Sequence, residues 1–294
     1  MRARVITLFG LATLEDFGRA GRRKFGVPPG GAFDRESMNL ANALLGNPPG
    51  SPVTEFSLGT MTLEIQEPGP VSVVGAASFV DVDGIKSAAG ARFPLNKGAT
   101  ITIGPPKRGL RTYLALPGGV KAELVLGSVS GTTVEPGGEI VSVKDADRIG
   151  YRKLAEEPHS LRERPLRVIA LSTGGWLNEE YEVSREINRV GLRLTGAKIK
   201  VEPSGTSEPS VIGAVQVTED GTLIIHGPDV PTIGGYRKLG GVIRADLDRV
   251  GQLSPGDKIK FVKISVEEAR ELWRQDERRR EDALQKISLL TKGT

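Results

Sequence analysis

The sequence predicts a mainly β protein, of the β-rich α+β class, and three observations support this prediction. Short runs of Val, Ile and Leu recur along the chain, as they do in β-strands. The 38 Gly and 19 Pro residues separate these runs, as turn residues do. Strand and helix patterns do not alternate regularly, which disfavours a doubly wound parallel sheet.

Ten runs have the character of strands, because each is short, rich in aliphatic residues and bounded by turn residues. Their number predicts that strands make up most of the regular structure. They cover 61–65, 71–74, 100–103, 112–116, 139–143, 167–170, 191–194, 213–217, 222–226 and 258–264.

Two helices are predicted. The first covers about 35–45, because Asp34 can cap its N-terminus and Gly46 can adopt the left-handed conformation that ends a helix. The second covers about 266–290, and Ser265 with Glu268 forms a capping-box pattern at its start. Acids and bases are balanced in this helix, so it is interpreted as a solvated surface helix; the alternative is a helix that docks on a partner.

A polar, charged segment without an apolar period, 153–165, is predicted to be a linker. It separates an N-terminal β-rich domain with a Gly-rich loop, 1–152, from a C-terminal domain, 166–294, that ends in the second helix. The length of 294 residues agrees with two domains.

The composition excludes several kinds of protein. The chain has no Cys, which excludes disulfides, thiolate zinc sites and thiol nucleophiles. It has two His, His159 and His226, so no metal site is predicted. The net charge of +4 equals the local excess in residues 1–25, and aromatic residues make up 5%, so nucleic-acid binding is not expected. No apolar run approaches the roughly 20 residues of a membrane span, and no signal peptide is recognised, so a cytoplasmic protein is expected.

Two segments are denser in Gly, Pro and polar residues than the rest of the chain. The first, 18–47, places five glycines before the first helix and can present backbone N–H groups to an anion; the alternative is tight turns followed by an N-cap. The second, 213–253, places the polar Gln216 in a strand and then a loop with adjacent glycines, Gly234 and Gly235. Such glycines let a backbone approach a ligand closely; the alternative is a long connection between strands.

Together these segments resemble the allophanate hydrolase subunit 2 family. This family includes the C-type subunit of bacterial ATP-dependent 5-oxoprolinase, the KipA-type proteins and part of the carboxyltransferase region of urea carboxylase. Blocks in the family's order cover about residues 5–270, and the resemblance implies a cyclophilin-like β-barrel architecture. The blocks are TLEDFGRAGRRKFGVPPGGAFDRESMNLANALLGN at 13–47, YLALPGG at 113–119, NRVGLRL at 188–194, GAVQV at 213–217, TIGGY at 232–236 and QLSPGD at 252–257.

For function, the resemblance implies a non-autonomous subunit of an ATP-dependent 5-oxoprolinase, which opens 5-oxoproline to glutamate. The implied partners are the B-type subunit of 5-oxoprolinase, which is a subunit 1 or KipI-type protein, and the A-type subunit, and homo-oligomerisation stays open. The implied cofactor is ATP, with Mg²⁺ as its companion ion. One alternative is a KipA-like regulatory protein without catalysis. The other is the carboxyltransferase component of a biotin-dependent urea or amide carboxylase; the chain has no Met-Lys-Met motif, so no covalently attached biotin is expected.

Opening a lactam with ATP requires groups for proton transfer or Mg²⁺, cations for phosphate, and polar groups that orient the substrate. The candidates for catalysis are Asp34, Glu55, Gln216 and Asp246. The candidates for binding substrate or nucleotide are Arg19, Arg189, Arg193, Thr232, Gly234, Gly235 and Tyr236. The structural alternatives are a helix cap for either Asp, ion pairs for Glu55 and the arginines, and a buried backbone partner for Gln216. His226 is interpreted as a buried structural residue.

Two departures from the family pattern concern charge. Val129 and Val230 stand where the family pattern has Arg. A missing guanidinium matters where the position binds phosphate or a carboxylate, so these replacements bear on the substrate more than on the fold. Lys107, Arg108 and Arg111 are candidates to compensate for them.

Overall fold

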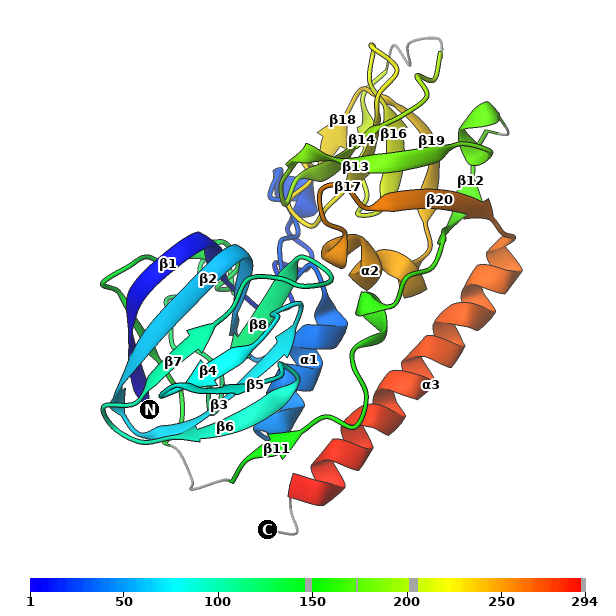
Figure 1. The fold of residues 1–294 in the computed structure, drawn as a ribbon. Helices are drawn as coiled ribbons and strands as arrows, with labels where there is room; N and C mark the ends of the chain where they lie inside the picture. The colour runs from blue at the N-terminus through cyan, green and yellow to red at the C-terminus, as the bar shows by residue number, and fades with distance from the viewer. Residues whose placement is uncertain (146–149, 173, 201–205, 292–294) are drawn as a thin grey trace. The chain divides into compact units, whose positions relative to one another are not determined.

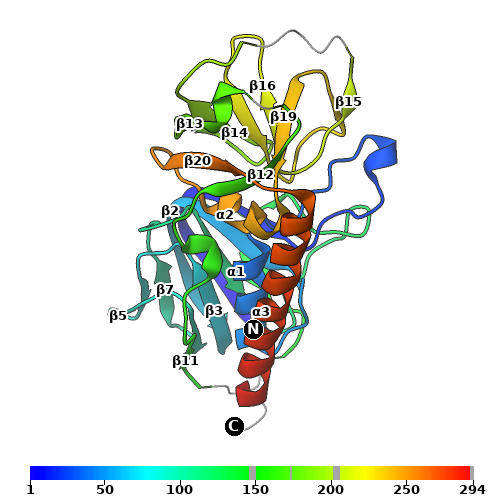
Figure 2. The ribbon, with the colours of Figure 1, turned by 90° about the vertical axis from the view of Figure 1, so that its right-hand side faces the viewer.

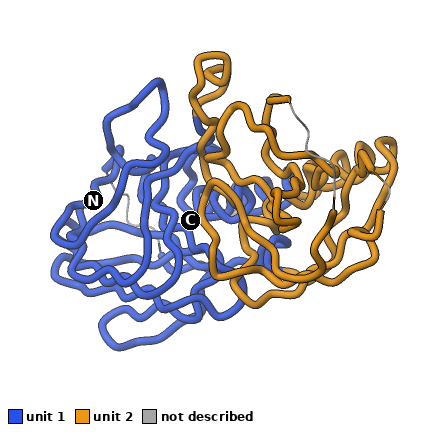
Figure 3. Tube along the Cα trace, turned by 90° about the horizontal axis from the view of Figure 1, so that it is seen from above, with its two compact units in different colours: residues 1–18, 34–161, 280–294 blue, residues 19–33, 162–279 orange. Residues whose placement is uncertain are grey.

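The computed structural model describes residues 1–145, 150–172, 174–200 and 206–291 (Figure 1). The chain divides into two compact units (Figure 3). Unit 1 consists of Met1–Gly18, Asp34–Leu161 and the chain from Arg280 onward, and unit 2 consists of Arg19–Phe33 and Arg162–Arg279. The division after Leu161 lies within the predicted linker, whereas the Gly-rich segment 19–33 belongs to unit 2 and the end of the C-terminal helix to unit 1.

Unit 1 is built on an antiparallel sheet that has eleven strands among the described residues. β1 and β2 form its longest pair, and shifts of register between Val5 and Thr7 and between Phe9 and Leu11 mark β-bulges there. Apolar residues of several strands, among them Met61, form its core. The strands are β1 (Arg2–Glu15), β2 (Val53–Glu67), β3 (Gly69–Gly75), β4 (Val80–Val82), β5 (Ile85–Ser87), β6 (Ala91–Leu95), β7 (Thr100–Ile103), β8 (Arg111–Ala115), β9 (Thr132–Thr133), β10 (Glu139–Val141) and β11 (Arg152–Lys153).

Helix α1 (Arg35–Leu44) lies against β3, β6 and β8 (Figure 2). The predicted N-cap is confirmed, because the Asp34 carboxylate accepts a hydrogen bond from the Ser37 N–H at 3.0 Å. Gly46 follows the helix with a φ of 71°, the left-handed conformation that was predicted. A short 3-10 helix, η2 (His159–Leu161), comes near the end of this part of the unit.

Unit 2 contains a closed barrel with the strand order β12-β19-β16-β17-β14-β13-β20. β12 and β20 pair in parallel, and the other neighbours pair antiparallel. Inside it, the Phe261 ring packs against Trp176 and Tyr181, with ring centroids 5.2 and 5.8 Å apart. The barrel strands are β12 (Leu166–Ala170), β13 (Glu180–Ile187), β14 (Gly191–Thr195), β16 (Ala214–Val217), β17 (Leu223–His226), β19 (Arg237–Val242) and β20 (Lys258–Lys263).

The remaining elements of unit 2 are short. β15 (Glu208–Pro209) and β18 (Ile233–Gly234) pair into a two-stranded ribbon beside the barrel. The others are the 3-10 helices η1 (Arg23–Phe25), η3 (Gly175–Leu177) and η4 (Arg244–Asp246), and helix α2 (Leu247–Gln252).

The C-terminal helix α3 (Val266–Thr291) begins with the predicted capping box. The Glu268 N–H donates to Ser265 Oγ at 3.1 Å, and the Ser265 N–H donates to Glu268 Oε2 at 2.8 Å. Ala269 and Leu272 pack against apolar residues of unit 2, and most other described side chains of α3 are exposed or half-buried. Ion pairs three residues apart, such as Arg279 with Asp276, agree with the predicted surface helix.

The mainly β class, the barrel architecture and both helices are therefore confirmed, and each of the ten predicted strands overlaps an observed one. The prediction missed β1, β4, β5, β6, β13, β19 and the shortest strands. β1 was missed because its bulges break the alternation of apolar and polar residues, so that Phe9 and Leu11 are exposed. Among the described residues, the longest stretches of helix are too short or too polar to cross a membrane.

Candidate functional site

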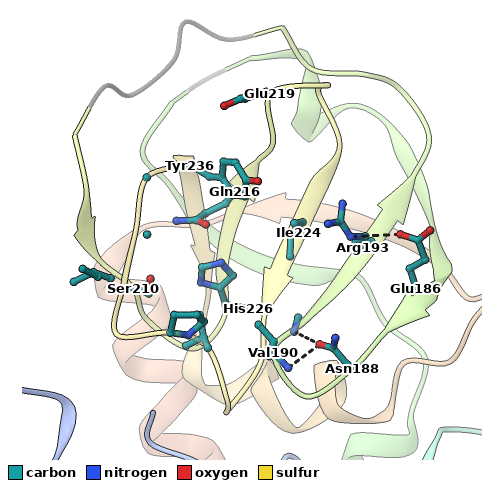
Figure 4. Close-up of a pocket in the computed structure, with 16 residues that line it drawn as sticks. Glu186, Asn188, Val190, Arg193, Ser210, Gln216, Glu219, Ile224, His226 and Tyr236 are labelled. Carbon is teal, nitrogen blue, oxygen red and sulfur yellow. Dashed lines mark hydrogen bonds and ion pairs between the residues drawn. The ribbon is translucent and has the colours of Figure 1, made fainter. Parts of the chain in front are cut away.

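A pocket of about 460 Å³ lies in unit 2, on the outer side of the barrel wall (Figure 4). Its position follows from the alternation of side chains along a strand. In β16, Val215 and Val217 belong to the barrel core, so Gln216 between them points outward. In β17, Leu223 and Ile225 point inward, so His226 shares the outer side with Gln216. Although both face away from the core, these polar side chains are buried, at 1% and 8% exposure.

The cover of this pocket is the segment that contains the β15–β18 ribbon. The Ser210 N–H donates to the Thr232 carbonyl at 3.0 Å, which joins the two sides of the ribbon. Lys238, which pairs with Gln216 across the barrel strands, donates from Nζ to the Pro209 carbonyl at 2.6 Å and so ties the ribbon to the barrel. Figure 4 shows Ser210 and Tyr236 on this covering side, facing Gln216 and His226.

The Gly-rich segment 19–33 supports the same cover. The Arg23 guanidinium donates to the Ser210 carbonyl and, at 3.5 Å, to the Thr232 carbonyl. The Gly30 N–H donates to the Pro228 carbonyl at 3.0 Å. The two segments that the sequence singled out therefore meet in one unit, but the first holds the pocket cover in place and does not line the pocket.

The residues of the covering loop that were predicted to bind ligand lie at the pocket or next to it. Gly234, Gly235 and Tyr236 line the pocket. A Cβ on Gly235 would meet nothing within 4 Å, so this backbone borders open space. Thr232 lies next to them in the ribbon and contributes its carbonyl to the hydrogen bonds with Ser210 and Arg23.

The charge at the pocket comes from its rim. Arg193 of β14 forms an ion pair with Glu186 at 3.5 Å, and its side chain is 45% exposed. Of the described residues that line the pocket, Arg193 alone is a permanent cation, against two acids, Glu186 and Glu219. Val230 also lines the pocket, at the position where the family pattern has Arg.

His226 is electrically neutral in this environment. Burial lowers its pKa from 6.5 to about 4, a hydrogen bond with the Val211 backbone opposes this shift, and the charge of Lys238 adds to it. Among the described residues, no group hydrogen-bonds to Nδ1 of His226 or to Nε2 of Gln216, and both atoms are almost completely inaccessible. Unpaired buried polar atoms are uncommon in folded proteins, and these two belong to residues that line the pocket.

The shifted pKa of His226 predicts a pH dependence of stability. Between pH 6.5 and about 4 the unfolded chain binds a proton at His226 and the folded chain does not, so the free energy of unfolding falls as the pH falls through this window. We expect this residue to account for a loss of roughly 2–3 kcal/mol at pH 4. Urea unfolding of the wild-type chain and of His226→Gln at pH 7, 6, 5 and 4 measures it, and an identical pH profile for both chains would contradict the assignment.

The predicted carboxylates Asp34 and Glu55 lie in unit 1, in a buried polar cluster. Besides the cap on α1, Asp34 Oδ2 accepts hydrogen bonds from Ser37 Oγ and Ser160 Oγ, both at 2.7 Å. Glu55 of β2 accepts from Arg111 Nε at 3.2 Å and from the Tyr113 hydroxyl at 2.8 Å. Each carboxylate thus has the structural partners that the alternative interpretations expected, a helix cap for Asp34 and an ion pair for Glu55.

Tyr113 links the Glu55 carboxylate to the backbone of Asp34. Its hydroxyl oxygen accepts a hydrogen bond from the Asp34 N–H at 2.8 Å, and its O–H donates a hydrogen bond to Glu55. Burial, together with the nearby charges of Glu55 and Asp34, raises the pKa of Tyr113 well above its ordinary value. Arg111, one of the predicted compensating cations, is 4% exposed and belongs to this cluster, where it forms an ion pair with Glu55.

The predicted carboxylate Asp246 is fully buried in unit 2, away from the residues that line the pocket. Its Oδ2 accepts from the Arg167 backbone N–H and from Arg167 Nε, both at 2.9 Å. Arg164 approaches Oδ1 at 3.3 Å. This hydrogen bonding raises the pKa of Arg167 and holds the start of β12 against the short helix η4.

The predicted cations differ in position as well. Arg193 lines the pocket, whereas Arg189 pairs with Asp229 at 2.9 Å and donates to the Gly31 carbonyl at 2.7 Å, which joins two loops of unit 2. The Arg19 N–H donates to the Pro29 carbonyl within the Gly-rich segment, and Arg19 is not among the lining residues. Over the part of the chain that is described, no group of three or more His, Asp or Glu side chains could hold a metal ion.

Two of the residues that line the pocket are not among the predicted site residues. His226 is interpreted from the sequence as a buried structural residue, and its burial is confirmed, whereas Ser210 is not singled out. Period-2 counting along 223–226 could have placed His226 on the outer face with Gln216, since Leu223 and Ile225 are the residues that a barrel core takes. No local signal identifies Ser210, because its burial depends on the ribbon that forms with 233–234.

Comparison with known proteins gives one consistent set of similarities. The model of the carboxyltransferase domain, subdomains A and B, matches residues 25–263. The chain is 32% identical to the C-type subunit of 5-oxoprolinase from Escherichia coli K12, over 91% of this chain and 92% of that protein. The solved structure of TTHA0988 has a TM-score of 0.82 and 27% identity and covers 89% of this chain. The K. lactis urea amidolyase has a TM-score of 0.84 and 25% identity and covers 96%. This chain spans 55% and 20% of those two solved chains.

Proposed function

Since the chain belongs to the family of carboxyltransferase domains with subdomains A and B, we propose that it is the C-type subunit of an ATP-dependent 5-oxoprolinase. The observation that carries this proposal is the extent of the match to the Escherichia coli protein of that type, which covers 92% of that protein. We assign the protein to the cytoplasm, where ATP is available.

We propose the pocket of unit 2 as the site of the amide substrate. Gln216 and His226 line it with neutral polar side chains, and Arg193 offers a cation for a carboxylate at its rim. A small cyclic amide such as 5-oxoproline matches this arrangement in its polar groups, and its carboxylate would share Arg193 with Glu186. ATP would activate the lactam by phosphorylating the amide oxygen, which removes the amide resonance. Water can then add to the carbonyl carbon, the C–N bond breaks to leave an acyl phosphate with a free amine, and a second water releases phosphate to give glutamate.

The pocket by itself does not fit the triphosphate of ATP. A triphosphate is bound by several cations and backbone N–H groups, and usually through Mg²⁺. The described lining residues offer one guanidinium, which is paired with Glu186, and a second acid, Glu219. We therefore propose that ATP and Mg²⁺ bind with the help of two partner proteins, a subunit 1 or KipI-type protein (the B-type subunit of 5-oxoprolinase) and the A-type subunit of 5-oxoprolinase.

For contact with the subunit 1-type partner, we propose the exposed apolar cluster of Phe9, Leu11 and Leu58 in unit 1. Phe9 and Leu11 are 69% and 66% exposed, and Leu58 is 47% exposed. Leu58 has a φ of 64°, a conformation that L-residues with side chains rarely adopt. A bulged, strained strand pair that turns three large apolar side chains toward solvent is typical of a protein-binding surface.

The test is reconstitution of the enzyme from this chain and its two partner proteins, produced from the same genome. We expect ADP and glutamate to form from 5-oxoproline, ATP and Mg²⁺ in the complete mixture. Omission of this chain should abolish product formation, and adding it back should restore it. The double variant Phe9→Asp, Leu11→Asp should no longer co-purify with the subunit 1-type partner, whereas Ile85→Asp, at an equally exposed site of unit 1, should.

Two outcomes would replace the proposed function. A stable complex without turnover of 5-oxoproline would favour the KipA-like regulatory role. Val230, which lines the pocket in place of an expected Arg, agrees with that role. Biotin-dependent carboxylation of urea by the complex would favour the carboxyltransferase role. Retention of the partner by the double variant would move the contact surface elsewhere.

A further inference from the structure

The β15–β18 ribbon that covers the pocket is too short to hold its own position. Its strands, Glu208–Pro209 and Ile233–Gly234, have two residues each. An isolated two-stranded ribbon is marginally stable at best, and Pro209 has no N–H to donate to the neighbouring strand. Next to the strands, the Ser210 N–H adds one hydrogen bond, to the Thr232 carbonyl at 3.0 Å. The position of the ribbon over the pocket therefore depends on contacts from outside it.

Arg23, in the Gly-rich segment, bridges the two sides of the ribbon where their pairing ends. Its Nη2 atom donates to the Ser210 carbonyl, which follows β15, and at 3.5 Å to the Thr232 carbonyl, which precedes β18. Hydrogen bonds from an ionised donor are roughly twice as strong as neutral ones. One guanidinium thus stabilises this end of the ribbon more than a further backbone hydrogen bond would.

Lys238 attaches the same ribbon to the barrel. It lies opposite Gln216 on the neighbouring strand β19, so the two side chains share the outer side of the barrel wall. The Lys238 ammonium group donates to the Pro209 carbonyl at 2.6 Å and to Glu208 Oε2 at 2.9 Å, and its side chain is 16% exposed. A lysine is rarely buried to this extent unless its charge is paired, and here both partners belong to β15.

The described residues that line the pocket do not include Arg23 or Lys238. We propose that these two are positioning residues, which hold the ribbon over Gln216 and His226 and so set the affinity of the pocket for its ligand. In taking the pocket as the substrate site we rest on the proposed function. When either contact is lost, the ribbon is open in part of the molecules, and the affinity falls with the fraction in which the pocket is complete.

Thiol labelling can measure opening of the ribbon, because the chain has no Cys of its own. Gln216 and Val215 are neighbours in β16 that point to opposite sides of the barrel wall, and they are 1% and 0% exposed. The thiol of Gln216→Cys should react with iodoacetamide when the ribbon opens, whereas that of Val215→Cys should react only when the barrel opens. The test compares the two labelling rates in the full chain, without ATP or partner proteins.

We expect Arg23→Met and Lys238→Met each to raise the labelling rate of Gln216→Cys by about tenfold or more and to leave that of Val215→Cys unchanged. Methionine keeps an unbranched side chain and removes the hydrogen-bond donors. Arg23→Lys and Lys238→Arg keep a charged donor, so they should restore most of the protection.

Two further variants are matched controls. Arg22→Met removes an exposed cation next to Arg23 in the Gly-rich segment, and Lys260→Met removes a cation of β20 whose side chain is 63% exposed. Neither should change the two labelling rates. Urea unfolding of every variant identifies a loss of global stability, which would accelerate labelling at both positions together.

In the reconstituted enzyme, Arg23→Met and Lys238→Met should raise the KM for 5-oxoproline by about fivefold or more and change kcat by less than about threefold. The reason is that an open ribbon weakens binding of the ground state and of the transition state alike. A general loss of folded enzyme would instead lower kcat and leave KM unchanged.

Unchanged labelling of Gln216→Cys in both methionine variants, or equal acceleration at both thiols, would overturn the proposal. An unchanged KM in a variant whose ribbon is open would overturn it as well. Because labelling needs neither ATP nor partners, its outcome is separate from that of the reconstitution. Selective opening of the ribbon, with no turnover of 5-oxoproline by the wild type, would refute the proposed enzyme and keep the two positioning residues.

Discussion

Replacing Glu55 with Ala is expected to lower the free energy of unfolding by about 3–5 kcal/mol. The carboxylate is 4% exposed, and it accepts from Arg111 Nε at 3.2 Å and from the Tyr113 hydroxyl at 2.8 Å. Removing it leaves the Arg111 guanidinium, also 4% exposed, without its ion-pair carboxylate. A buried charge that loses its counter-charge is far more destabilising than the intact pair is stabilising.

Urea unfolding of the purified chain measures this effect. Glu157→Gln is the matched control, since it breaks the pair with Arg108 on the exposed surface of the same unit and should change stability by less than about 1 kcal/mol. Replacing both Glu55 and Arg111 by Leu should restore most of the loss, because the variant then buries neither charge. If Glu55→Ala unfolds like the wild type and only the reconstituted turnover is lost, Glu55 is a catalytic group after all.

The elements that the sequence predicted well are those whose cause is local. Asp34 and Gly46 delimit α1 through hydrogen bonds and a backbone conformation that involve only the neighbouring turn. The same holds for Ser265 and Glu268 at the start of α3. β1 could not be predicted in this way, because its bulges place Phe9 and Leu11 on the exposed face, where a period of two expects polar residues.

The site was predictable to the extent that residues of the segment 213–253 build it. Gln216, Gly234, Gly235 and Tyr236 come from a single stretch of sequence, and all four line the pocket. The carboxylates were harder, because a buried Asp or Glu has the same sequence signature whether it meets a substrate or an arginine. Asp246 finds Arg167, 79 residues away, and that pairing exists only once the barrel closes.

We therefore expect substitution of Asp246 to lower the stability of the fold, and not only the turnover of the enzyme. Asp246→Ala should lower the free energy of unfolding by about 3–5 kcal/mol, because Arg167 loses both its charge partner and the acceptor of its backbone N–H. Asp246→Asn keeps one acceptor and should lose roughly half as much. The half-exposed pair of Glu180 with Lys258 provides the control in the same unit, and Glu180→Gln should change stability by less than about 1 kcal/mol.

The same variants decide between a structural and a catalytic Asp246. The group is fully buried and does not line the pocket, so a folded Asp246→Asn chain should keep an unchanged KM for 5-oxoproline in the reconstituted enzyme. Its turnover in the reconstituted enzyme should fall only in proportion to the folded fraction. Unchanged unfolding with turnover reduced about 100-fold or more would instead place this carboxylate at the reacting atoms. The barrel would then have to open at η4 during catalysis, because in the closed barrel Arg167 and Arg164 occupy the Asp246 carboxylate.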